Sequence, residues 1–103
     1  MVKKEMYLYS WSREEFNYDI VISLADDGRS IVRVRKCDKL LATNERIELL
    51  EKEFIKVVKK YIALCRGMKF KDAKDKIVGK KSFVEMCDAF GNALVDKATG
   101  GRR

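Results

Sequence analysis

The chain has 103 residues, of which 47% are hydrophobic and 38% are charged, and its formal net charge is +7. This length and composition predict one globular domain over residues 1–103 with its own hydrophobic core, and they exclude a disordered chain. Because the sequence contains no histidine, it also excludes Ser-His and Cys-His catalytic pairs and histidine metal sites.

Residues 16–37 have the pattern of a β-hairpin, since apolar and polar residues alternate on both sides of an Asp-Asp-Gly segment. A three-residue loop over residues 26–28 would pair Ile22 with Val32 and keep the apolar residues on one face of the sheet. A two-residue loop would instead mix apolar and charged residues on that face. We therefore expect the three-residue loop, with its glycine in the left-handed conformation.

An aromatic-rich strand over residues 5–11 is expected to precede this hairpin. A four-residue connection would place Trp11 opposite Phe16 and Tyr9 opposite Tyr18. One face of the predicted sheet then carries Tyr7, Tyr9, Trp11, Phe16, Tyr18, Ile20, Ile22, Leu24, Val32 and Val34. The other face carries Leu8, Asp19, Val21, Arg33 and Arg35. Two alternatives stay open here, namely a helical turn in the connection that begins at Ser12 and a short fourth strand over residues 39–42.

From Asn44 the apolar residues recur at intervals of three and four, which is the spacing of one helix face. Thr43 or Asn44 is suited to cap this helix, and Gly67 is a natural stop. The pattern predicts a long helix of about 23 residues, the strongest element in the chain.

Two shorter helices are predicted to follow. The first has Phe70, Ala73 and Ile77 on one side and ends at Gly79. The second opens on a capping box over residues 82–85 and has an apolar stripe of Phe83, Cys87, Phe90 and Leu94. Gly91 either weakens that helix or admits another element at close range. Residues 98–103 are predicted to be a frayed tail.

These elements predict an α+β fold in which a three- or four-stranded antiparallel β-meander packs on a long helix and two shorter C-terminal helices follow. In the order of its elements, a meander and then a long helix, the chain resembles several small single-strand-binding folds that work as dimers. That resemblance implies a nucleic-acid ligand and a homodimer, and no motif accompanies it.

Three cysteines lie far apart in the sequence, and no two of them are in a CxxC arrangement. This pattern is typical of neither a disulfide framework nor a zinc site, and it favours a reducing compartment. Cys65 and Cys87 fall on apolar stripes, so we expect them to be buried. Cys37, at the end of a strand, is expected to be the most exposed of the three.

The positive charge is concentrated in residues 56–81, which hold ten Lys and Arg against two Asp and have a net charge of +8. The rest of the chain therefore has a net charge of −1. A local excess of this kind indicates a surface for phosphates, although a solvated helix face is the plain alternative. Since lysine predominates over arginine, contacts are expected to be with the phosphate backbone and largely independent of base sequence.

The aromatic face of the sheet has two interpretations. It can pack against the long helix as the core, which is the reading we favour, or it can present rings on which single-stranded bases stack. The residues predicted to contact nucleic acid are Lys56, Lys59, Lys60, Lys69, Lys71, Lys74, Lys80 and Lys81, with Arg33, Arg35, Trp11 and Tyr9 as secondary contacts.

The sequence thus predicts a small, basic, non-enzymatic nucleic-acid-binding protein, DNA or RNA, without a cofactor, a metal or a membrane partner. A homodimer is also compatible with it. The alternative is a homo-oligomeric protein-interaction module, an adaptor or inhibitor of an acidic partner, with no role in nucleic-acid binding. Because no apolar run typical of a signal peptide follows the charged start, we expect an intracellular protein, cytoplasmic or associated with nucleoid or nucleus.

Overall fold

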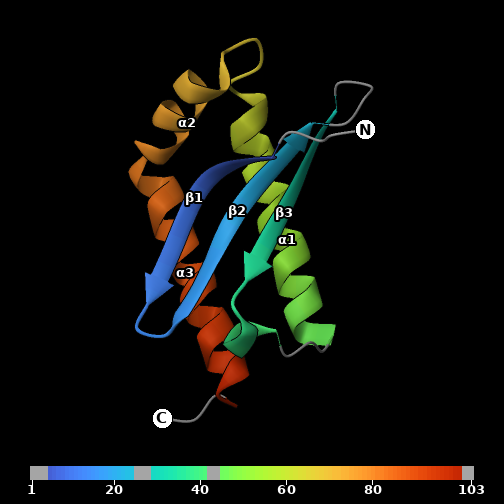
Figure 1. Ribbon diagram of the computed structural model, residues 1–103, viewed down its shortest axis with the longest axis vertical. Coiled ribbons are helices and arrows are strands. Elements are labelled where there is room, and N and C mark those ends of the chain that lie inside the picture. Colours follow the sequence, from blue (N-terminus) through green and yellow to red (C-terminus); the bar gives the residue numbers. More distant parts are fainter. Residues whose placement is uncertain (1–4, 25–28, 42–44, 101–103) are drawn as a thin grey trace.

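The computed structural model describes residues 5–24, 29–41 and 45–100. Three antiparallel strands, β1 (Glu5–Arg13), β2 (Phe16–Leu24) and β3 (Ser30–Lys36), form a sheet in the order β1-β2-β3. A short 3-10 helix, η1 (Asp38–Leu40), leads to α1 (Glu45–Ala63), α2 (Phe70–Val78) and α3 (Lys81–Ala98). Figure 1 shows the sheet in front and the helices behind it, so the helices cover one face of the sheet and leave the other, called the open face below, without a helix over it. The predicted α+β order, a meander followed by helices, is confirmed.

The register between β2 and β3 is the one that the alternation predicts. Ile22 lies opposite Val32, and Asp19 lies opposite Arg35. The predicted three-residue loop itself, over residues 26–28, falls outside the described residues. The agreement follows from the pleat, since a slip of one residue would turn every apolar side chain of a strand to the solvent.

The register between β1 and β2 differs from the predicted one by two residues. Trp11 lies opposite Tyr18, not Phe16, because the strands are joined by a two-residue turn in which Glu14 has a φ of 56°. The strands therefore continue through Ser12 and Arg13, and the proposed helical turn at Ser12 is wrong. A tight two-residue turn matches the twist of the paired strands better than the longer connection does.

A bulge between Tyr7 and Tyr9 overturns the predicted faces of two residues. The bulge adds Leu8 as an extra residue to β1, and Leu8 is almost completely buried in the core. Tyr7 was expected on the core face, but it is exposed and its hydroxyl accepts a hydrogen bond from Arg35 on the open face. Bulges reverse the inside-outside alternation, which a strict period of two cannot anticipate.

The core lies between the covered face of the sheet and the helices, and it is built around stacked aromatic rings. Tyr18 is fully buried, with Trp11 stacked on it at 5.4 Å between centroids and Phe90 edge-on at 5.2 Å. Phe54 of α1 stacks on Phe90 of α3 at 3.9 Å. The aromatic face of the sheet is therefore mostly core, as the favoured reading had it.

Gly91 admits a close approach of the sheet, the second of the two roles proposed for it. A Cβ atom at this position would lie 2.3 Å from Cε2 of Trp11. The indole thus lies directly against the backbone of α3, and its Nε1 donates a hydrogen bond to Asp88 at 3.1 Å.

Several predicted helix boundaries are corrected. The 19 residues of α1 end at Ala63, and turns then lead to Gly67, which has a φ of 87°. Its proposed caps at Thr43 and Asn44 lie outside the described residues. No capping box forms at residues 82–85, because α3 begins at Lys81 and has no side-chain cap.

Two further predictions change. Residues 38–40 form η1, so the open question of a fourth strand is settled in favour of three strands within the described residues. The prediction of a frayed tail is wrong for residues 98–100, since Ala98 is still helical and the amides of Thr99 and Gly100 are hydrogen-bonded to α3, and residues 101–103 lie outside the described residues. The predicted burial of the cysteines is confirmed, with Cys65 and Cys87 buried and Cys37 partly exposed.

Candidate nucleic-acid interface

The basic segment, residues 56–81, follows a continuous path along the C-terminal half of α1, the connection to α2, α2 itself and the start of α3. Its exposed cations are Lys56, Lys59, Lys60, Arg66, Lys69, Lys71, Lys76 and Lys81. Lys74 and Lys80 are half-exposed. The fold therefore leaves nearly all of the predicted phosphate contacts accessible to a ligand.

Few of these cations have an acidic neighbour. Lys56 lies 3.8 Å from Glu53, and Lys81 lies 4.0 Å from Glu85. Both pairs are exposed and therefore weak. Among the residues that the structure describes, the other lysines of the segment make no ion pair within 4 Å. Asp72 and Asp75 are exposed on α2 between these lysines and reduce the positive charge there only partly.

A cleft of about 960 Å³ adjoins the basic segment. It opens between the ends of the three strands on one side and the end of α1, the following turn and α2 on the other. Its apolar lining includes Leu8, Ile62, Met68, Phe70 and Ile77. In size it falls within the range of ordinary ligand sites.

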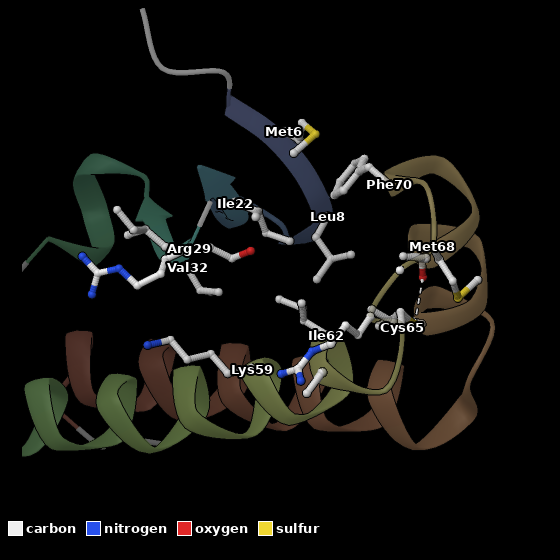
Figure 2. A pocket seen from close by; sticks show the side chains of 17 residues that line it. Met6, Leu8, Ile22, Arg29, Val32, Lys59, Ile62, Cys65, Met68 and Phe70 are labelled. Atoms are coloured by element: carbon white, nitrogen blue, oxygen red, sulfur yellow. Dashed lines mark hydrogen bonds between the residues drawn. The ribbon is translucent and has the colours of Figure 1, made fainter. Parts of the chain in front are cut away.

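Cations surround one side of this cleft. Figure 2 shows Arg29 and Lys59 on opposite walls at one end of the cleft, with their charged groups turned away from its apolar part, whereas Met68 and Phe70 lie at the other end. Arg66 is a third basic residue in the lining, and no Asp or Glu is found among the described lining residues. The cleft is thus apolar inside and positively charged at one side, which suits a ligand with an apolar part and an anionic group.

The two aromatic residues predicted as secondary contacts belong to the core. Trp11 is only 6% exposed. Tyr9 is half-buried, with its ring edge-on to Phe83 at 5.8 Å, and burial raises the pKa of its hydroxyl. A base could stack on Trp11 only if the indole left its place between Tyr18 and Gly91.

Arg33 and Arg35 are not brought together with the lysines. Both are exposed on the open face of the sheet, on the far side of the sheet from the helices. Arg33 forms a 2.6 Å ion pair with Glu5, and Arg35 lies over the ring of Tyr7. These two residues form a separate surface in which each guanidinium already has a partner.

The lysines of this interface can be found from the sequence, but the cleft cannot. Met68 and Phe70 follow α1 closely, and Arg29 precedes β3, so nothing in their spacing connects them. Only the tertiary fold brings them to one opening, where the ends of the strands meet the turn after α1 and the start of α2. The one available signal is that Met68 and Phe70 are apolar residues inside the most basic part of the chain.

Within residues 5–24, 29–41 and 45–100, no three Cys, Asp or Glu side chains come together in an arrangement that could hold a metal ion. No helix in that part of the chain is long and apolar enough to cross a membrane. No protein-family model, curated protein sequence or solved structure matches the chain.

Proposed function

We propose that this protein binds nucleic acid without reading its base sequence, and that it prefers single strands to duplexes. The observation that carries the proposal is the position of the apolar cleft beside the largely unpaired lysines of residues 56–81. The lysines account for attraction to a phosphate backbone, and the cleft accounts for the preference between the two forms of nucleic acid.

The phosphate contacts are assigned to the exposed and half-exposed cations of the basic segment. Lysine supplies a mobile point charge and lacks the planar fork with which arginine reads a guanine edge. A surface made almost entirely of lysine therefore follows the backbone and discriminates poorly between sequences. On this basis Lys59, Lys69, Lys71, Lys74, Lys80 and Lys81 are the central contacts.

The cleft supports a preference for single strands. An unstacked base can leave the strand and enter an apolar opening, where Phe70 and Met68 offer aromatic and polarisable surface. Lys59 and Arg66 in the same lining then lie close to the flanking phosphates. Bases inside a duplex are paired and stacked, so they cannot enter without being flipped out at a cost of a few kcal/mol.

Fluorescence anisotropy with a labelled single-stranded oligonucleotide tests the proposal. If about five phosphates are neutralised, affinity should fall roughly a hundredfold between about 50 and 200 mM salt. Reversing Lys71, Lys74, Lys80 and Lys81 to Glu should abolish binding, with circular dichroism to confirm that the variant folds. Absence of binding at low salt, or an affinity independent of salt, would overturn the proposal.

A matched control separates the position of the charge from its total. Reversing Lys39, Arg46, Lys52 and Lys97 to Glu changes the net charge from +7 to −1, as does the first variant. All four residues are exposed and lie outside residues 56–81. The control should retain most of the affinity, and an equal loss in both variants would mean that only the overall charge matters.

The cleft is tested by Met68→Asp, which places a carboxylate at a residue that is 39% exposed. We expect this variant to lose affinity for single strands by about tenfold while its weak duplex binding changes much less, since the stacking of one base on an aromatic side chain such as Phe70 is worth about 1–3 kcal/mol. Equal losses for the two substrates would contradict the assigned role of the cleft.

A further inference from the structure

We propose that the outer face of α1 pairs with the same face of a second copy of this chain, in an antiparallel arrangement with two-fold symmetry. The face is defined by Leu49, Glu53, Lys56, Val57, Lys60 and Leu64, and we call it the α1 seam. The partner is another copy of the protein because the seam is self-complementary. When two copies of α1 run in opposite directions, Leu49 meets Leu64 and Glu53 meets Lys60.

The seam lies on the solvent-exposed side of α1, where three aliphatic and three charged side chains share one face. The buried side of α1 presents Ile47, Phe54 and Val58 to the core, where the helix meets β3, α2 and α3. On the outside, Leu49 is 60% exposed and Leu64 is 68% exposed. Together with Val57, which is 36% exposed, they give this face three exposed aliphatic side chains, one near each end and one at the centre.

All six residues of the seam lie on one face. They follow one another at intervals of four, three, one, three and four residues, so at 100° per residue they stay within one side of the helix. Leu64 continues the helical course just beyond Ala63, since its amide donates to the carbonyl of Lys60 at 3.3 Å.

The intervals read the same in both directions, and this symmetry determines the pairing. In an antiparallel pair centred between Lys56 and Val57, Leu49 of one copy lies opposite Leu64 of the other. Glu53 likewise lies opposite Lys60. A two-fold interface requires such self-complementarity, because residue i contacts residue j and residue j contacts residue i.

The charges distinguish this arrangement from the parallel one. A parallel pair would place Glu53 against Glu53 and Lys60 against Lys60, so like charges would be opposed at both positions. The antiparallel pair opposes unlike charges twice, and at the centre the aliphatic part of Lys56 can cover Val57 of the other copy. Neighbouring charges of opposite sign contribute mainly to the choice of orientation.

The seam is small, so the dimer should be weak. Six residues per copy are far fewer than the roughly 20–30 on each side of a standard interface, so we expect the association to be weak and to depend on concentration. Pairing would also occupy Lys56 and Lys60, which leaves the cations of α2 and its flanks free for phosphate. Dimer formation thus does not depend on the proposed binding of nucleic acid, and the experiments that test it contain no nucleic acid.

Sedimentation equilibrium of the purified protein, from about 5 µM to about 1 mM, measures the association directly. The wild type should be a dimer at the upper end of this range. Glu53→Lys and Lys60→Glu should each be monomeric, because each variant opposes like charges on both sides of the axis. The double variant carrying both changes should regain the wild-type dissociation constant to within about threefold.

Mixing the two single variants gives the sharpest result. Glu53→Lys carries lysine at both positions 53 and 60, whereas Lys60→Glu carries glutamate at both. An equimolar mixture should therefore form heterodimers, although neither variant dimerises alone. Lys69→Glu, outside the seam, should dimerise like the wild type. A wild type that stays monomeric at the highest concentration, or dimers that the single variants leave unchanged, would overturn the proposal.

Discussion

At the scale of single residues, the contact between Trp11 and Gly91 shows how the absence of a Cβ atom at one position lets the sheet pack closely on α3. Glycine in the middle of a helix costs about 1 kcal/mol relative to alanine. The helix tolerates this cost because a Cβ atom at position 91 would lie within 2.5 Å of three atoms of the indole. The glycine is therefore required by packing rather than by backbone conformation.

We predict that Gly91→Ala lowers the free energy of unfolding by roughly 2 kcal/mol, because overpacking costs more than the gain in helix propensity. Chemical denaturation followed by circular dichroism measures the change. Asp96→Ala, at an exposed position of the same helix, should alter stability by less than about 0.5 kcal/mol. A Gly91→Ala variant as stable as the wild type would mean that Trp11 does not lie against α3 in this way.

At the scale of the elements, β2 and α3 are joined by a buried polar contact. The hydroxyl of Tyr18 donates a 2.6 Å hydrogen bond to the backbone carbonyl of Cys87. Burial raises the pKa of the Cys87 thiol to about 12, and burial likewise raises the pKa of Tyr18 above its ordinary value. Both groups are therefore neutral in the folded protein over a wide range of pH.

The burial of the Cys87 thiol predicts a loss of stability in alkali. In the unfolded chain the thiol of Cys87 ionises near its ordinary pKa of 9.0, whereas in the folded protein it stays protonated until about 12. The unfolded state thus releases protons first, and each such group lowers the free energy of unfolding by about 1.4 kcal/mol per pH unit in that interval. Its contribution is fully present below pH 9 and is lost as the pH rises towards 12.

Urea denaturation at a series of pH values from about 7 to 11 measures this slope. Cys87→Ala should be less stable than the wild type at neutral pH because it leaves a cavity, yet its stability should fall less steeply above pH 9. Parallel curves for the two proteins would show that Cys87 is not responsible for the alkaline loss.

At the scale of the whole molecule, the aromatic cluster connects the strands to the C-terminal helices. Tyr18 of β2 contacts Trp11 of β1, Phe54 of α1 and Phe90 of α3. The halves that the sequence divides into strands and helices thus share one core. The basic segment and the α1 seam lie on the helical side of that core. Arg33 and Arg35, with their partners Glu5 and Tyr7, lie on the opposite side of the sheet.

We predict that the protein unfolds as one cooperative unit. The single tryptophan, Trp11, reports on the packing of β1 against α3, while far-ultraviolet circular dichroism reports mainly on the helices. Because one core supports both halves, the two signals should give the same midpoint and slope in urea. Two separated transitions would show that the helical half retains its structure without the sheet.

Much of this architecture follows from the order of residues. The alternation in residues 16–36 determines the pairing of β2 with β3, and the intervals of three and four predict α1 and α2 with the residues that they bury. These features depend on near neighbours along the chain, so a periodic pattern is enough to reveal them. The concentration of lysine in residues 56–81 is likewise visible in the sequence.

Tertiary structure decided the rest, because it depends on contacts between distant segments. The bulge at Leu8 exchanges the predicted faces of Leu8 and Tyr7, since the core gains more from burying leucine than from keeping a regular strand. The cleft exists only where the ends of all three strands meet the connection between α1 and α2. Likewise, the exposure of Leu49 and Leu64 is settled only when the sheet and α3 have covered the other side of α1.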